Sequence, residues 1–171
     1  MILYHASYKT VSSPSAGYGR KLVDFGQGFY LTALYEQAVA WAQITAFKHN
    51  SYTPTVNTFL LDDIILDDTV LNSNLYRVKS FPEYDFEWLD YVVDCRRGGK
   101  LQEQYDIVEG GVANDNVIDT VELYEKGIIT AEQAIGQLRY KKVNHQLCIH
   151  SQEIIDNFLH FDSSVRVGSI N

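Results

Sequence analysis

The stretch Asp24–Thr32, Asp-Phe-Gly-Gln-Gly-Phe-Tyr-Leu-Thr, constrains the fold of this chain more than any other. Gly26 and Gly28 have no Cβ, so the backbone can come close to a ligand or to another strand. The four residues after Gly28 favour a strand. In a pleated strand Tyr30 points away from the face that its two neighbours share, so that face can be buried while Tyr30 faces a cleft. The alternative is an ordinary buried strand with a glycine bulge, and the pattern alone leaves both open.

Length and composition indicate a single soluble domain over residues 1–171. A chain of 171 residues is long enough to bury a proper core, and 46% hydrophobic with 21% charged residues is ordinary for a globular protein. The net charge of −8 argues against non-specific binding to nucleic acid. The chain opens without a basic n-region and contains no long apolar stretch. We therefore expect a cytoplasmic protein that is not bound to a membrane.

Strand and helix patterns both occur without regular βαβ alternation, which predicts an α+β fold. Strands are expected over 2–7, 29–32, 57–61, 75–78, 105–108 and 145–150, with an edge strand or frayed tail over 165–167. Helices are expected after Thr32 as far as residue 49, then over about 83–96, 114–126, 131–138 and 152–158. The expected N-terminal signals are Thr32, Pro82, the capping box Thr130-Ala-Glu-Gln133, and Ser151. Period two in the late strand predicts Leu147 and Ile149 on one face and Gln146 and Cys148 on the other.

Familiar chemical motifs are mostly missing. The chain has neither the phosphate-binding loop nor the dinucleotide fingerprint. The acidic pairs at 62–63 and 67–68 lack the glycine and closing Glu of a calcium loop, so we interpret them as solvated turns and expect no metal. Cys95 and Cys148 have no metal-ligand spacing and are expected to be buried thiols.

Three short segments remain: His-Ala-Ser at 5–7, Phe-Gly-Gln-Gly-Phe-Tyr-Leu-Thr at 25–32 and Gln-Leu-Cys-Ile-His at 146–150. Together they resemble the ADP-ribosyltransferase superfamily, in the diphtheria-toxin and PARP branch whose triad is His-Tyr-Glu. Further segments at 18–20, 90–97 and 105–110 resemble an uncharacterised bacterial family grouped with that superfamily, and this closer resemblance covers nearly the whole chain. This resemblance implies a fold of two small β-sheets that form an NAD-binding cleft, with helices around the cleft.

The resemblance also implies roles for individual residues. His5 would bond the adenosine-side ribose, and Tyr30 would stack on the nicotinamide ring. Ala6 stands where the family has Gly, but it keeps the backbone groups that hold the nicotinamide amide. Gln146 occupies the position at which the superfamily has its catalytic Glu. It retains the hydrogen bond to the nicotinamide ribose but not the negative charge, and losing such a group costs about 10²–10³ in rate.

The expected catalytic residues are therefore His5, Tyr30 and Gln146. Phe25, Phe29 and Tyr30 are expected to form an apolar slot for the ring, and Arg20 is the candidate phosphate contact. The residues expected to contact NAD are His5, Ala6, Ser7, Arg20, Phe25, Gly28, Phe29 and Tyr30.

Three functions stay open. The first is an enzyme, an NAD-dependent mono-ADP-ribosyltransferase or NAD glycohydrolase, acting on an unknown protein or nucleic-acid acceptor. The second is a catalytically weak or inactive module of the same fold that binds NAD or another nucleotide. The third is a nucleotide-free interaction protein with a small cognate partner protein, as in a toxin–antitoxin or phage-defence pair. Nicotinamide release separates the first from the second, and a thermal shift with NAD separates the second from the third.

Overall fold

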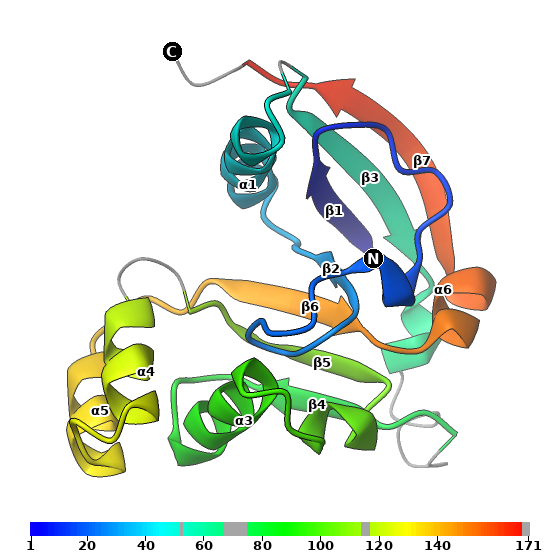
Figure 1. Cartoon of the computed structure of the whole chain (residues 1–171). Coiled ribbons are helices and arrows are strands. Elements are labelled where there is room, and N and C mark those ends of the chain that lie inside the picture. Colours follow the sequence, from blue (N-terminus) through cyan, green and yellow to red (C-terminus); the bar gives the residue numbers. More distant parts are fainter. Residues whose placement is uncertain (52, 67–74, 114–116, 169–171) are drawn as a thin grey trace.

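The computed structural model describes residues 1–51, 53–66, 75–113 and 117–168, and it confirms an α+β fold with two small sheets (Figure 1). The first sheet has the order β1-β3-β7, formed by Ile2–Ser7, Thr55–Leu61 and Leu159–Arg166, all antiparallel. The second has the order β2-β6-β5-β4, formed by Phe29–Leu31, His145–Ile149, Ile107–Gly111 and Val78–Phe81. Its β4–β5 pair is parallel and its other two pairs are antiparallel. The helices are α1 Tyr35–Lys48, α3 Phe86–Arg96, α4 Ile118–Glu125, α5 Ala131–Leu138 and α6 Gln152–Phe158.

A β-bridge between Tyr4 and Thr32 joins the two sheets. The Tyr4 N–H donates to the Thr32 carbonyl oxygen at 2.8 Å, and the Thr32 N–H donates back to the Tyr4 carbonyl at 3.0 Å. This reciprocal pair sets the end of β2 against β1. His5 is one residue from the bridge and Tyr30 is two residues from it, so they become neighbours although they lie 25 positions apart in the sequence.

The first core lies where the two sheets face each other. Leu3, Phe59 and Leu61 come from the first sheet, and Leu147 and Ile149 come from the second, all 5% exposed or less. Burying these side chains supplies the main driving force for holding the sheets together. The predicted alternation of β6 is confirmed, because Cys148 belongs to a different core on the far face of the second sheet.

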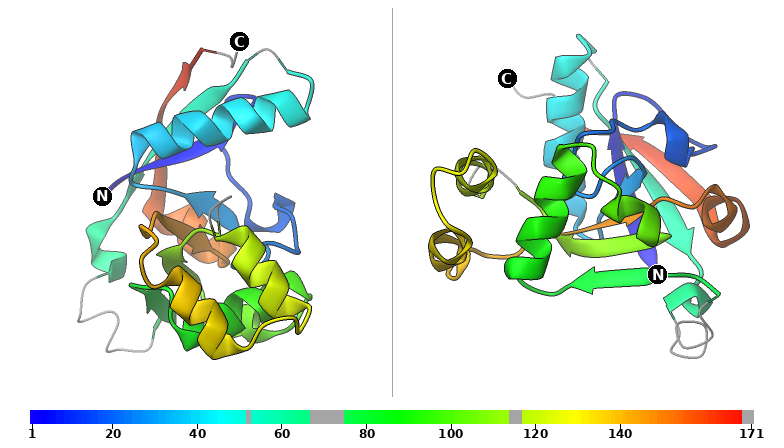
Figure 2. Two further views of the ribbon diagram at one scale, coloured as in Figure 1. Left: turned by 90° about the vertical axis from the view of Figure 1, so that its left-hand side faces the viewer. Right: turned by 60° about the horizontal axis from the view of Figure 1, so that its bottom comes forward.

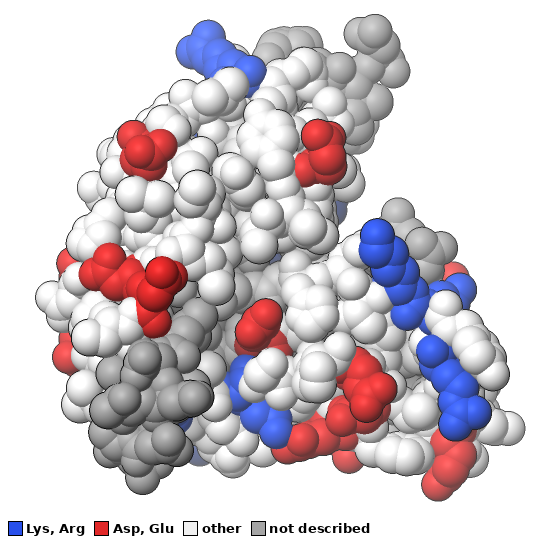
Figure 3. All heavy atoms as spheres, turned by 180° about the vertical axis from the view of Figure 1, so that it is seen from behind, with Lys and Arg blue, Asp and Glu red and all other residues white. Residues whose placement is uncertain are grey.

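The second core is covered by α3, α4 and α5. This buried cluster includes Trp88 and Val92 of α3, Val121 of α4, and Val108 and Cys148 of the sheet. On the other half of the molecule α1 lies across the face of the first sheet, as Figure 2 shows, with its small residues Ala38 and Ala42 against Val56. From behind, the molecule is hollowed between the half that carries α1 and the half that carries α4 and α5 (Figure 3).

The local helix signals were mostly predicted correctly. The Thr130–Gln133 capping box is present, and the Ser151 hydroxyl accepts the Ile154 N–H at 3.4 Å. Helix α3 begins later than expected, because Asp85 caps it by accepting the Trp88 N–H at 2.7 Å. Pro82 follows β4 and takes no part in that first turn.

Other element predictions were wrong in position. Thr32 does not cap α1: its hydroxyl accepts the Leu34 N–H at 3.1 Å, and Leu34 is the N-cap. The strand expected over 75–78 lies at Val78–Phe81. The expected tail strand is β7, eight residues long and paired along the whole of β3. The second acidic pair, 67–68, and the expected start of the helix at 114–116 lie outside the described residues.

Candidate functional site

A cavity of about 500 Å³ opens at the junction of the sheets. One side is formed by His5 and the loop between Ser7 and Gly19, and the other by residues 28–30 at the start of β2. The loop contributes Tyr8, Tyr18 and five serine or threonine hydroxyls, those of Ser7, Thr10, Ser12, Ser13 and Ser15. Lys9 is the single charged side chain among the described lining residues. The lining is therefore mainly apolar surface that carries several hydroxyl groups and one cation.

His5 is fixed in one tautomer. Its Nδ1 lies 2.8 Å from the carbonyl oxygen of Tyr30, and because a carbonyl only accepts, Nδ1–H is the donor. Its ring stacks on Phe29 with centroids 4.3 Å apart. Burial lowers the pKa of His5 below its usual value, and the hydrogen bond to Tyr30 acts in the opposite direction. Neutral His5 thus keeps Nε2 as an acceptor, and Nε2 bonds to no described residue.

Asn57 organises the loop that lines the cavity. It is 0% exposed, and its Oδ1 accepts the Val11 N–H at 2.8 Å. Its Nδ2 donates to the Lys9 carbonyl at 3.2 Å and more weakly to the His5 carbonyl at 3.4 Å. A buried polar group is costly unless it is bonded in this way. The role of Asn57 was not predicted from the sequence. Its only signal there is an amide inside a strand of apolar residues and threonines.

Tyr30 anchors the glycine turn that precedes it. Its hydroxyl donates to the Gly26 carbonyl at 2.6 Å and accepts the Phe25 N–H at 3.1 Å. Burial raises the pKa of this hydroxyl well above the usual value. Gly26 has φ of +76°, a conformation that favours glycine. Tyr30 is half-buried: its ring packs against the second core beside the turn, and its backbone lies at the cavity, where its carbonyl meets His5.

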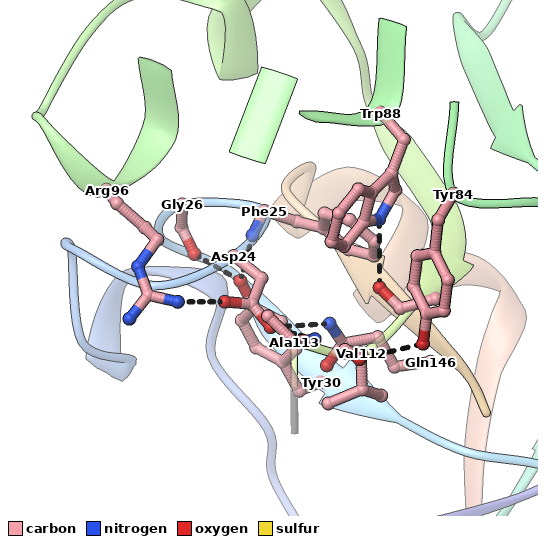
Figure 4. Close-up of polar contacts among 11 residues, drawn as sticks. Asp24, Phe25, Gly26, Tyr30, Tyr84, Trp88, Arg96, Val112, Ala113 and Gln146 are labelled. Carbon is pink, nitrogen blue, oxygen red and sulfur yellow. Dashed lines mark hydrogen bonds and ion pairs between the residues drawn. The ribbon is translucent and has the colours of Figure 1, made fainter. Parts of the chain in front are cut away.

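Gln146 lies on the same face of the second sheet as the Tyr30 side chain, because Tyr30 pairs with Cys148 and Gln146 is two residues from Cys148. It is 5% exposed and is not among the described residues that line the cavity. Its Nε2 is directed at Oδ2 of Asp24, at 3.5 Å (Figure 4). The structure therefore brings His5 and Tyr30 to one cavity, and it leaves Gln146 beside Tyr30 but under the surface.

Asp24 sits among three donors. Arg96 Nη1 lies 3.0 Å from Oδ1, while the Ala113 N–H donates to Oδ2 at 2.9 Å from the side where Gln146 also approaches (Figure 4). Burial raises the pKa of the Asp24 carboxyl, and the Ala113 N–H, Arg96 and Gln146 each act to lower it. No role for Asp24 was predicted from the sequence, where it is only the first residue of the glycine-containing stretch.

The other predicted NAD contacts divide into two groups. Ser7, Gly28 and Phe29 line the cavity. Phe25, Ala6 and Arg20 are not among the described lining residues.

The structure corrects the prediction for Phe25, and it locates Ala6 and Arg20 outside the described cavity lining. Phe25 is 0% exposed and packs on Phe81 and Tyr91 in the second core, so it does not form a ring slot. Ala6 packs in the cluster under α1, and Arg20 is exposed. The cation at the cavity is Lys9, whose Nζ lies 5.8 Å from the ring centre of Tyr18.

Gly28 is needed for packing as well as for access. A Cβ at this position would lie 2.4 Å from Cys148 Sγ and 2.9 Å from the Ile149 carbonyl oxygen. The glycine therefore lets β2 approach β6 closely. It also leaves bare backbone at the edge of the cavity.

The described part of the chain holds no group of three or more His, Cys, Asp or Glu side chains that could bind a metal ion. Cys95 and Cys148 are free and buried. Among the described helices, none combines the length and the apolar character that crossing a bilayer requires.

Comparison with curated proteins found no match, and comparison with solved structures found none either. One family model does match, and it covers residues 1–161 under the description "Protein of unknown function (DUF3990)". Since the match spans nearly the whole chain, including the residues that line the cavity, the chain belongs to the DUF3990 family.

Proposed function

We propose that this protein is an NAD-dependent mono-ADP-ribosyltransferase or NAD glycohydrolase that binds NAD at the junction of its two sheets. The observation that supports this most is the 2.8 Å contact of His5 Nδ1 with the Tyr30 carbonyl. It joins two of the three segments that resemble the superfamily and sets both residues on one cavity. The third segment contributes Gln146 from the strand next to Tyr30.

The cavity suits a dinucleotide in its charge. Residues 1–23 carry Lys9, Arg20 and Lys21 and no Asp or Glu, although the whole chain has a net charge of −8. Lys9 would attract the pyrophosphate as a point charge, and the loop hydroxyls would donate to its oxygens. His5 Nε2 would accept a hydrogen bond from a ribose hydroxyl, which its neutral state permits.

The chemistry needs few groups. The bond between nicotinamide and the ribose C1′ breaks, and its electron pair leaves with nicotinamide. The ribose carries positive charge until an acceptor nucleophile, or water, bonds to C1′ and loses its proton. Tyr30 would support the nicotinamide ring, and the Gln146 Oε1 would accept a ribose hydroxyl hydrogen bond that strengthens in the transition state.

The direct test is nicotinamide release from NAD by the purified protein, compared with His5→Gln and with His160→Gln. His160 lies on β7 and is 54% exposed, so its variant is a matched control. We expect release by the wild type and by His160→Gln, and a loss of at least about tenfold in His5→Gln. Equal release by all three proteins would contradict the assignment of His5.

A second function, NAD binding without turnover, is favoured by one observation: position 146 carries an amide in place of a carboxylate. Here the wild type would release no nicotinamide, yet NAD would raise its melting temperature. If the protein releases no nicotinamide from NAD and NAD does not change its melting temperature, both proposals are wrong. The remaining function is then an interaction protein with a small partner.

A further inference from the structure

We propose that Asp24 is the positioning residue for Gln146: its carboxylate holds the Gln146 amide by Nε2, so that Oε1 is left to accept the ribose hydroxyl. This inference rests on the proposed function for its catalytic part. Its structural part, the pairing of a carboxylate at 24 with an amide at 146, stands independently of any ligand.

The geometry gives the amide a defined orientation. A carboxylate only accepts, so the group that faces Asp24 Oδ2 across 3.5 Å has to be the NH₂ end of Gln146. Among the described residues Oε1 accepts no hydrogen bond. At 3.5 Å the hydrogen bond itself is long, and the orientation comes mainly from the charge of Asp24 acting at short range on a side chain that is 5% exposed.

Asp24 is itself held by two further donors. Arg96 from α3 binds Oδ1 at 3.0 Å, and the Ala113 N–H binds Oδ2 at 2.9 Å (Figure 4). The three side chains thus form a row of aligned charges and dipoles that runs Arg96, Asp24, Gln146. The negative end of this row is Gln146 Oε1. A dipole fixed in this sense favours positive charge developing on a ribose next to it, without reorganisation during the reaction.

The same arrangement explains why position 146 holds an amide. A Glu at 146 would place a second carboxylate against Asp24 in a buried site, where like charges repel strongly. Gln146→Glu should therefore not simply restore a missing catalytic charge. The carboxylate and the amide form a pair, and changing one alone should damage the site.

The test compares four proteins: the wild type, Asp24→Asn, Gln146→Glu and the double variant Asp24→Asn/Gln146→Glu. The first measurement is thermal melting without ligand. We expect Gln146→Glu to lower the melting temperature by at least about 2–4 °C in the wild-type background. In the Asp24→Asn background the same change should be neutral or stabilising, because the amide at 24 can donate to the new carboxylate. An equal effect of Gln146→Glu in both backgrounds would overturn the pairing.

Asp24→Asn could fail to fold because Arg96 loses its partner. In that case the Gln146→Glu comparison is made in a background of Asp24→Asn joined to Arg96→Met, which removes the unpaired cation. The same two outcomes then decide the pairing.

The second measurement is the kinetics of nicotinamide release together with NAD affinity. Asp24→Asn should lower kcat by about tenfold and change the NAD Kd by less than twofold, the signature of an interaction made mainly in the transition state. In a Gln146→Ala background the same change should have no further effect on kcat. A tenfold loss that persists without Gln146, or a loss confined to NAD affinity, would overturn the positioning role.

The two parts fail separately. If the wild type releases no nicotinamide, the enzymatic function is wrong, while the melting cycle still supports or contradicts the Asp24–Gln146 pair. If the wild type is active and the melting cycle shows no coupling, the pairing is wrong and the enzymatic function stands.

Discussion

The Arg96 guanidinium lies 3.0 Å from the Asp24 carboxylate, with 20% and 14% of the two side chains exposed. This pair ties α3 to the start of the glycine turn across 72 positions of sequence. Together with the Tyr30 hydroxyl, it fixes the turn from both ends. This glycine turn leads directly into β2 and therefore sets the position of β2 at the cavity.

Arg96→Met tests how much this ion pair contributes to the free energy of unfolding. Removing the cation leaves a mostly buried carboxylate without its charged partner, which should lower the free energy of unfolding by about 3 kcal/mol. Urea unfolding provides the measurement. Lys126→Met is the control, because Lys126 pairs with Glu122 on an exposed face and should cost less than about 0.5 kcal/mol. Similar costs for the two variants would show that the Asp24 pair is no stronger than a surface pair.

Tyr30→Phe separates the hydroxyl of Tyr30 from its ring. The variant loses the hydrogen bonds to Gly26 and Phe25, so we expect a loss of about 1–3 kcal/mol in the free energy of unfolding. The ring remains, so NAD affinity measured by calorimetry should stay close to that of the wild type. Tyr30→Ala should weaken NAD binding by a further 1–3 kcal/mol or so, the range for one stacking platform. A Tyr30→Phe protein as stable as the wild type would contradict the anchoring role of the hydroxyl.

Gly28→Ala tests the close approach of β2 to β6. The new methyl group would collide with Cys148 Sγ and the Ile149 carbonyl, and relieving such a contact costs about 1–3 kcal/mol. Gly136→Ala is the matched control: a Cβ on this α5 residue meets no atom within 4 Å, and Ala should stabilise the helix by about 0.5–1 kcal/mol. Chemical denaturation of both variants should therefore give shifts of opposite sign.

The lowered pKa of His5 predicts a pH dependence of stability. Between the folded pKa and about 6.5 the unfolded chain binds a proton that folded His5 does not, so stability falls as the pH drops below about 6.5. The pKa of His150 is also lowered by burial, and it contributes with the same sign. Urea titrations between pH 8 and pH 5 should show a shallower decline for His5→Gln than for the wild type, and the shallowest for the variant that also carries His150→Gln. An unchanged slope in His5→Gln would contradict this assignment.

Features set by neighbouring residues could be predicted from the sequence. The Thr130–Gln133 capping box, the Ser151 cap and the alternation of β6 each depend on side chains only a few positions apart. Strand β7 could not be predicted in the same way. Most of its side chains are exposed or half-buried, so its strand character comes from pairing with β3, about 100 positions earlier in the chain.

The candidate site shows the same limit. The pattern around Tyr30 correctly placed its side chain on the face opposite to Phe29 and Leu31. It could not show that the turn at Gly26 directs Phe25 into the second core. It also could not reveal Asn57 under the loop or Asp24 beside Gln146, because those contacts join positions 46 and 122 residues apart.

The most direct measurement is a crystal structure of the protein soaked with NAD. We predict density for the dinucleotide in the cavity between β1 and β2, with a ribose hydroxyl at about 3 Å from His5 Nε2 and the pyrophosphate near Lys9. The nicotinamide ribose should lie beside Tyr30 on the side of Gln146 Oε1. Density for NAD at a different surface, or an empty cavity at saturating NAD, would contradict the proposal that this junction of two sheets is an NAD site.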